Sequence, residues 1–177
     1  MNRATMPTVD SAFRPVTEAD LDRATRWFHE PHVSPWWTPA DADDVAGAVR
    51  GDVRLDPWLL LVDGAPVGYL QTYVLADHPA YAEACATVGM PATAYGFDYL
   101  IGDRSWIGRG LGTLAIGRFV EEIVFGLHGA AVACAGPHPD NGASLRVLEK
   151  NGFSVAGDIV TADGPERLMV LDRRLTR

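Results

Sequence analysis

A glycine-rich turn in the middle of the chain has residue types suited to binding a phosphate group. Gly108, Gly110 and Gly112 alternate with other residues, and Arg109 lies between the first two. Alternating glycines let a ligand approach the backbone, and the free N–H groups of a following helix, at the positive end of its dipole, favour an anion. Arg109 adds a full positive charge. The turn therefore predicts a phosphate-binding loop.

An aspartate on the strand before this turn has the chemistry needed to hold and deprotonate an amine. Residues 95–101 are rich in aromatic and β-branched side chains, as a strand should be, whereas aspartate is unfavourable in strands. Side chains alternate along a strand, so Asp98 points to the face opposite Phe97 and Tyr99. A carboxylate there can bind an ammonium group and accept its proton. We therefore interpret Asp98 as a functional residue.

The elements that position these residues form a mixed α/β pattern. Thr17 is predicted to cap the first helix, with Asp20 closing a capping box. The segment 76–93 breaks periodicity, and we expect it to be an inserted loop, because long loops in compact domains are often functional. The patterning predicts strands at 13–16, 58–62, 66–75, 95–101, 130–135, 153–161 and 167–173. It predicts helices at 17–29, 42–50, 111–127 and from the turn at 136–141 to residue 151.

Composition limits the class of protein. A chain of 177 residues with 47% hydrophobic and 21% charged residues is typical of one globular domain. We expect residues 1–10 to form a flexible leader and residues 11–177 a single domain. No apolar run approaches the roughly 20 residues of a membrane span, and the first residues contain no apolar signal segment, so we expect a cytoplasmic protein.

Charge and cysteine content narrow the partners. The net charge of −8 is spread along the chain, which disfavours nucleic acid as a partner and favours cationic small molecules. Because no apolar run is long enough to span a membrane, we expect no membrane partner either. Cys85 and Cys134 have no metal-ligand spacing, so we expect buried or incidental thiols and no metal site.

Spacing excludes two common nucleotide loops. The Walker pattern ends in Gly-Lys-Ser/Thr, and Gly112-Thr113 lacks the lysine. The dinucleotide fingerprint needs Gly-x-Gly-x-x-Gly, which the glycines here do not match. The turn instead resembles the pyrophosphate loop of the GNAT superfamily of N-acetyltransferases, Gln/Arg-x-x-Gly-x-Gly/Ala, with Ile107 departing from the first position. A second segment, Asn141 to Phe153, resembles the family's Asn-x-x-Ala/Ser-x-x-x-Tyr-x-x-x-Gly-Phe helix.

The resemblance extends along essentially the whole chain. It implies a GNAT fold, a mixed and mostly antiparallel sheet of about seven strands flanked by about four helices. It also implies acetyl-CoA as the cofactor, bound by Leu100, Ile101, Gly108, Arg109, Gly110, Leu111, Gly112, Thr113 and Asn141. Many relatives carry a tyrosine that protonates the departing thiolate, where this chain has Leu148. Another group or water then supplies the proton, or the thiolate leaves unassisted, because a thiol is acidic near pH 8.5.

Several segments resemble one branch of the family, the aminoglycoside 6'-N-acetyltransferases. They are Trp36-Trp37, the hairpin 63–73, the strand 96–98, the loop 108–113, and the segments 149–153 and 161–165. This resemblance implies that Asp98 contacts the reacting amine and is the catalytic base. It implies substrate contacts at Trp36, Trp37, Gln71, Tyr73, Asp98 and Asp163. One acidic position of the family, just before the helix at 141–151, is Gly136 here.

The implied function is transfer of an acetyl group from acetyl-CoA to a primary amine of a cationic small molecule, the 6'-amine of an aminoglycoside antibiotic. Neither cysteine belongs to a nucleophile–base motif, which predicts direct transfer without a covalent enzyme intermediate. The hydroxylysine acyltransferases of siderophore synthesis share the hairpin and loop but carry histidine where Asp98 stands. They are one alternative, and an acetyltransferase for another polyamine or amino sugar is a second. A non-catalytic acyl-CoA-binding module is a third, which Leu148 leaves open. We expect a monomer or a homodimer.

Overall fold

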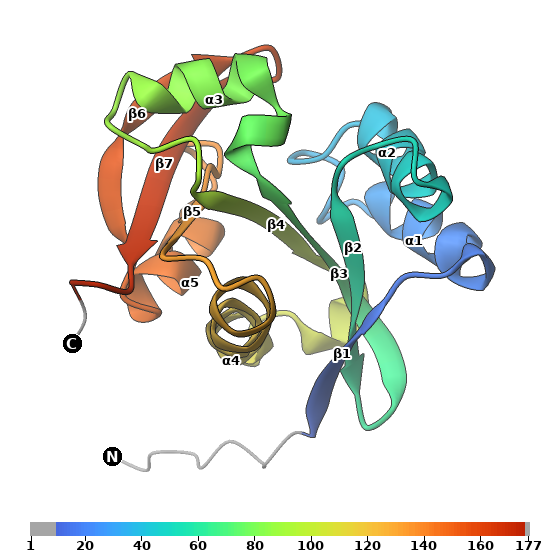
Figure 1. Ribbon diagram of the computed structural model, residues 1–177. Coiled ribbons are helices and arrows are strands. Elements are labelled where there is room, and N and C mark those ends of the chain that lie inside the picture. Colours follow the sequence, from blue (N-terminus) through green and yellow to red (C-terminus); the bar gives the residue numbers. More distant parts are fainter. Residues whose placement is uncertain (1–9, 176–177) are drawn as a thin grey trace, which may run out of the picture.

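The computed structural model describes residues 10–175. Seven strands in this part of the chain form one sheet in the order β1-β2-β3-β4-β5-β7-β6 (Figure 1). The strands are β1 (Ser11–Pro15), β2 (Asp56–Val62), β3 (Ala65–Val74), β4 (Tyr95–Ile101), β5 (Val132–Ala135), β6 (Ser154–Thr161) and β7 (Gly164–Asp172). Neighbouring strands are antiparallel except β4 and β5, which are parallel. The predicted mixed, mostly antiparallel sheet is confirmed. Residues 1–9 of the predicted leader lie outside the described residues.

The helices correct two expectations. They are α1 (Leu21–Phe28), α2 (Pro39–Arg50), α3 (Pro79–Ala86), α4 (Leu111–Phe119) and α5 (Gly142–Lys150), with 3-10 turns η1 (Glu18–Asp20), η2 (Leu75–Asp77) and η3 (Arg104–Trp106) and a π-helix η4 (Val120–Leu127). The segment 76–93 is therefore not a loop. Its two-turn helix is too short to show a periodic pattern, and Pro79 suits a first helical turn. The predicted helix at 111–127 is also wrong in part, since it becomes a π-helix after Phe119 while its apolar residues stay buried.

The helices cover the two faces of the sheet differently. On one face α4, η4 and α5 pack over a core that includes Leu60, Leu70, Phe97, Ala133 and Met169. The opposite face has two separate groups, shown in Figure 1, where α1 and α2 lie beside β2 and β3 and α3 lies over β6 and β7. The middle of this second face, above β4, therefore lies between two helical layers.

The central parallel pair is paired over a very short length. The register of β4 with β5 contains only Tyr95 opposite Ala133 and Gly96 opposite Cys134. Beyond Gly96, β4 continues along β3 on its other side, with Asp98 opposite Gln71. The carboxyl-terminal half of β4 thus has a neighbouring strand on one edge only, and the sheet opens between β4 and β5.

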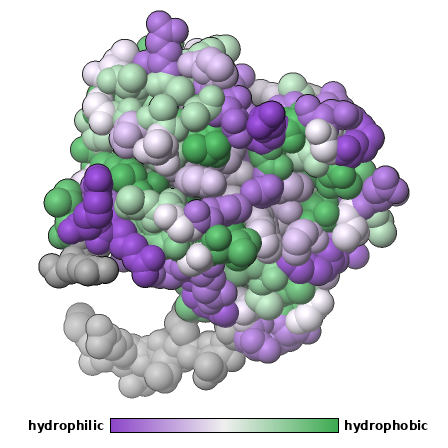
Figure 2. Space-filling model, viewed as in Figure 1, coloured by the Kyte–Doolittle hydropathy of each residue, from purple (hydrophilic) through white to green (hydrophobic). Residues whose placement is uncertain are grey.

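The surface carries no continuous apolar band on the face seen in Figure 2, where hydrophobic residues lie scattered among polar ones. Among residues 10–175, no helix has the length and apolar character needed to cross a membrane. Trp36 is one of the large hydrophobic side chains that are exposed, at 42%. It belongs to the segment between α1 and α2, so the exposed ring lies next to the uncovered part of the sheet.

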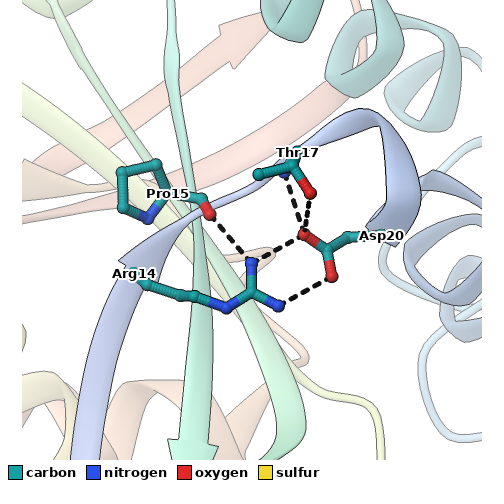
Figure 3. Close-up of polar contacts among 4 residues, drawn as sticks. All are labelled: Arg14, Pro15, Thr17 and Asp20. Carbon is teal, nitrogen blue, oxygen red and sulfur yellow. Dashed lines mark hydrogen bonds and ion pairs between the residues drawn. The ribbon is translucent and has the colours of Figure 1, made fainter.

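A partly buried ion pair holds the start of α1 against β1 (Figure 3). Arg14 donates Nη1 to Asp20 Oδ2 at 2.7 Å and Nη2 to Oδ1 at 2.8 Å. Thr17 donates its backbone N–H at 2.9 Å and its hydroxyl at 2.8 Å to the same carboxylate, so the predicted capping box is confirmed. The hydrogen bonds from Arg14, opposed by burial, hold the pKa of Asp20 well below its usual range.

Asp20→Asn is expected to lower the free energy of unfolding at pH 7 by about 2 kcal/mol, the scale of charged hydrogen bonds. Because the pKa of Asp20 is lower in the folded state, its contribution is complete above the unfolded pKa and declines as pH falls below about 4. The difference between variant and wild type should therefore shrink in acid. Urea unfolding at several pH values measures it. Asp22→Asn, at an exposed position of α1, is the matched control, and an equal loss in both variants would contradict a special role for Asp20.

Candidate active site

A cavity of about 520 Å³ lies on the sheet face between the α1–α2 layer and α3. Its walls come from the segment before α2, from α2 itself, from β3 and β4, from the start of α3 and from the β6–β7 turn. All the residues expected to bind substrate line it, namely Trp36, Trp37, Gln71, Tyr73, Asp98 and Asp163. The fold thus gathers these residues from four distant parts of the chain, and their roles as substrate contacts stay predictions.

Asp98 is held by a short relay of hydrogen bonds. Tyr69, fully buried under α1 and α2, donates its hydroxyl to Gln71 Oε1 at 2.7 Å. The amide of Gln71 is thereby oriented so that Nε2 donates to Asp98 Oδ2 at 2.9 Å. Phe97 and Tyr99 pack into the core of the other face, as strand alternation predicts. The relay fixes the Oδ2 atom of Asp98, and the Tyr73 side chain also interacts with this carboxylate.

Burial raises the pKa of Asp98 to about 6, an effect that the hydrogen bond from Gln71 opposes. A carboxylate with a pKa near 6 is ionised at pH 7 but binds a proton more strongly than an ordinary aspartate. That property suits a general base, which works best when its pKa lies near the working pH. Perturbed carboxylates in a cleft are also a common mark of functional sites.

The cavity is acidic beyond what the motifs indicated. Asp41, Asp44 and Glu166 line it together with Asp98 and Asp163, and its lining residues include no lysine or arginine. Burial raises the pKa of Glu166 to about 7 and also raises the pKa of Asp44. Five carboxylates in a lining without lysine or arginine create a negative field that attracts ammonium groups.

Sequence reasoning missed several of these residues. Asp41 and Asp44 lie on a helix that also carries Asp43, so nothing in the pattern separates them from an ordinary solvated aspartate. Tyr81 also lines the cavity, and the aperiodic segment that contains it was the one signal available. Glu166 occupies an ordinary strand position, and its side chain reaches the cavity only because β7 lies two strands from β4 in the sheet.

The glycine-rich turn has the backbone geometry that an anion-binding loop needs. Gly108 and Gly110 have φ angles of 74° and 80°, in the left-handed region that residues with side chains rarely adopt. Gly110 is the N-cap of α4, so the N–H groups of Leu111, Gly112 and Thr113 have no acceptor one turn earlier in the helix. Arg109 is exposed, with its guanidinium 5.8 Å from the Trp106 ring centre. The loop therefore fits a pyrophosphate group.

The other residues expected to bind the cofactor surround the opening between β4 and β5. Leu100 and Ile101 are the last two residues of β4. The Leu100 side chain is buried in the core, so Leu100 can contact a cofactor only through its backbone groups. Asn141 caps α5 by accepting the N–H of Ser144 with Oδ1 at 3.1 Å. The Asn141 side chain also lines a smaller cavity of about 100 Å³ in the opening.

Asp98 lies where the two cavities meet. The smaller cavity is lined by Asp98 and Tyr99 from β4 and by Asn141 and Ser144 at the start of α5. The Tyr99 hydroxyl is 2.8 Å from the Ser144 hydroxyl. Trp36, Trp37, Asp98, Gly136 and His138 line both cavities. Leu148 is fully buried in the main core, so position 148 offers no proton donor to either cavity.

Neither cysteine is placed to act as a nucleophile. Cys85 and Cys134 are buried free thiols, and burial raises the pKa of Cys85 to about 11 and raises the pKa of Cys134 as well. A thiol is reactive as the thiolate, so raised pKa values make both thiols inert at neutral pH. Among residues 10–175, no group of three His, Cys, Asp or Glu side chains is placed to hold a metal ion.

Comparison with known proteins identifies the class to which this fold and site belong. Residues 16–161 match the family model of the acetyltransferase (GNAT) domain. The chain is 31% identical over 170 residues to the aminoglycoside N(6')-acetyltransferase type 1 of Klebsiella pneumoniae, covering 91% of this chain and 82% of that protein. The chain therefore belongs to the GNAT family of acetyltransferases.

Solved structures agree with this assignment. The aminoglycoside acetyltransferase AAC(6')-Ib in complex with coenzyme A superposes with a TM-score of 0.80 and 29% identity, over 93% of this chain and 96% of that chain. Its complex with coenzyme A and kanamycin gives a TM-score of 0.79 at 29% identity, with the same shares of both chains. The GNAT fold predicted from the sequence is confirmed.

Gly110→Val is expected to reduce affinity for coenzyme A at least tenfold, because the side chain disfavours the left-handed φ angle and blocks the approach of a phosphate. Gly51→Val is the matched control, since Gly51 has a φ angle of 84° and ends α2 away from the loop. Both variants should lose about 1–2 kcal/mol of stability from strain. Calorimetric titration with coenzyme A separates them, and unchanged affinity in Gly110→Val would overturn the assignment of this loop.

Proposed function

We propose that this chain transfers the acetyl group of acetyl-CoA to a primary amine of a cationic small molecule, the 6'-amine of an aminoglycoside antibiotic. The observation that carries the proposal is the position of Asp98, at the junction of an acidic cavity and the opening between β4 and β5. Support for the donor and the acceptor comes from AAC(6')-Ib, whose structures are complexes with coenzyme A and with kanamycin.

The acidic cavity suits an acceptor that carries several ammonium groups. Its five carboxylates come from three regions, α2, β4 and the β6–β7 hairpin, so negative charge surrounds the ligand on several sides. Trp36 and Trp37 add aromatic faces to the same cavity, and ammonium groups bind favourably over such faces. A neutral acceptor would leave these carboxylates without a partner, which makes a polyamine the better fit.

The donor end is built from backbone groups and two polar side chains. The N–H groups at the start of α4 and the guanidinium of Arg109 are suited to the pyrophosphate of acetyl-CoA. Asn141 and Ser144, at the start of α5, are suited to the amide-rich arm that joins the pyrophosphate to the thioester. These groups would hold the donor, and acetyl-CoA, when bound, would supply an activated thioester carbonyl.

Asp98 prepares the amine for reaction. An ammonium group cannot attack a carbonyl, because its nitrogen has no free lone pair, so it must first lose a proton. The Asp98 carboxylate attracts the ammonium group and accepts that proton, directly or through a water molecule. The bond from Gln71 keeps Oδ2 in place, so the carboxylate is oriented before the amine arrives. The two cysteines are buried, and the pKa values of their thiols are raised. This supports direct transfer of the acetyl group to the amine rather than transfer through an acyl-enzyme.

A thiol-release assay with acetyl-CoA and a panel of acceptors tests the function. We expect release with kanamycin and acetylation of its 6'-amine, together with kanamycin resistance when the gene is expressed in a sensitive host. Thiol release only with a hydroxylysine-type amine would mean that the acceptor is a siderophore precursor and not an aminoglycoside. Binding of acetyl-CoA with no release for any amine would make the chain a binding module rather than an enzyme.

Asp98→Asn is expected to lower kcat/KM by roughly 10²- to 10⁴-fold, the range of general acid–base catalysis, with coenzyme A affinity unchanged. In the wild type, kcat/KM should rise with pH through about 6, because Asp98 is protonated and neutral below that pKa and can neither hold an ammonium group nor take its proton. The variant should lose the part of this rise that Asp98 causes near pH 6. Steady-state kinetics from pH 5 to 9 show both effects, and a fully active variant would exclude Asp98 as the base.

A further inference from the structure

Gly136 and Glu166 share one space in the cavity. Gly136 follows β5 and lines both cavities. A Cβ atom at position 136 would lie 1.9 Å from Glu166 Oε2 and 2.8 Å from the Tyr81 hydroxyl. The backbone of Gly136 does not have a positive φ angle, so its conformation does not require glycine. The absence of a side chain here therefore makes room for the Glu166 carboxylate.

Among the described residues, the side chains that donate hydrogen bonds to the Glu166 carboxylate are neutral. Tyr81 donates its hydroxyl to Oε2 at 2.8 Å, and Thr161 donates its hydroxyl to Oε1 at 3.0 Å. These donors fix the direction of the carboxylate without neutralising it. The next residue in β7 shows the contrast, because Arg167 pairs with Asp158 through two bonds of 2.8 and 3.0 Å. An arginine thus lies next to Glu166 in the sequence, yet it pairs with Asp158 instead.

Keeping a partly buried carboxylate ionised without a cationic partner costs free energy. Glu166 is partly buried, and burial, with a smaller contribution from the charge of Asp98, raises its pKa. A cation that enters the cavity would remove this penalty and gain a charge-assisted hydrogen bond. Glu166 comes from β7 and Asp98 from β4, with β5 between them in the sheet. Carboxylates on two different strands suit two amines of one acceptor.

We infer that Glu166 binds a second ammonium group of the acceptor while Asp98 holds the reacting amine, and that Gly136 is the position that admits Glu166 to the cavity. The inference rests on the proposed function and narrows it to acceptors with at least two amines. Glu166 is a substrate-binding residue in this scheme and takes no proton from the reacting amine. Removing its charge should therefore change binding of the acceptor far more than turnover.

The first experiment measures kanamycin binding and turnover by Glu166→Gln. Calorimetry without acetyl-CoA should show at least a tenfold higher Kd for kanamycin, as expected for loss of a charge-assisted hydrogen bond. KM for kanamycin should rise in parallel, with kcat within about threefold and coenzyme A affinity unchanged. Glu121→Gln, exposed on η4 and outside both cavities, is the charge-matched control and should behave as the wild type.

The second experiment moves the carboxylate across the shared space. Glu166→Ala should weaken kanamycin binding as Glu166→Gln does, and the double variant Gly136→Asp with Glu166→Ala should recover most of the lost affinity, because its new carboxylate enters the vacated position. Gly136→Asp by itself should lower the melting temperature, since Glu166 blocks its side chain.

The outcomes separate this inference from the proposed function. A wild type that binds coenzyme A but neither binds nor acetylates kanamycin would overturn the proposed function, and the inference with it. A wild type that acetylates kanamycin, with Glu166→Gln indistinguishable from it, would overturn the inference and leave the function standing. A structural role for Glu166 would lower the melting temperature and weaken coenzyme A binding in Glu166→Gln, which also contradicts the inference.

Discussion

The short pairing of β4 with β5 is the constraint on which the site depends. Two residues of each strand are paired before the strands separate, in a sheet whose other neighbours are antiparallel and paired over greater lengths. The separation leaves one edge of β4 open at the point where Asp98 lies. It also places the starts of the two helices that follow these strands, α4 and α5, at the same end of the sheet. Ligands in α/β proteins commonly bind where neighbouring strands part in this way.

The second face of the sheet completes the site because its covering is interrupted. The cluster under α1 and α2 contains Tyr69, and the cluster under α3 contains Cys134, while Asp98 lies between the two clusters. Tyr69 links packing to chemistry, since a side chain fully buried in the first cluster orients Gln71 and through it the carboxylate of Asp98. The base is thus positioned by the hydrophobic core rather than by a flexible loop, which keeps its geometry fixed before substrate arrives.

Charge is distributed unevenly through the molecule. Asp20 is a buried carboxylate that is paired, and Arg14 lowers its pKa, so this ion pair stabilises the fold. Asp98 and Glu166 are partly buried carboxylates whose pKa values are raised, so keeping them ionised costs stability. The core of hydrophobic side chains on both faces offsets that cost. Because the charges of these carboxylates are poorly stabilised without ligand, binding of a cation to this site releases more free energy than binding to carboxylates that are already paired.

The sequence by itself determined the features that depend on neighbouring residues. The glycines of the loop were predictable because positive φ angles and helix starts are local properties, and both Gly108 and Gly110 have such angles. The alternation that directs Asp98 away from Phe97, and the capping box of Thr17 with Asp20, also follow from local spacing. The sheet was predictable for the same reason, since apolar and β-branched runs identified its strands to within a few residues.

Tertiary structure decided what depends on how distant elements pack. Helix α3 was missed because it has two turns, and burial of Cys85 against β5, β6 and β7, rather than an amphipathic pattern, holds it in place. The meeting of Gly136, Glu166 and Tyr81 was invisible in the sequence, since these residues come from the segment after β5, from β7 and from α3. Strand order and register bring them together, and both result from packing across the whole sheet, which no short stretch of sequence encodes.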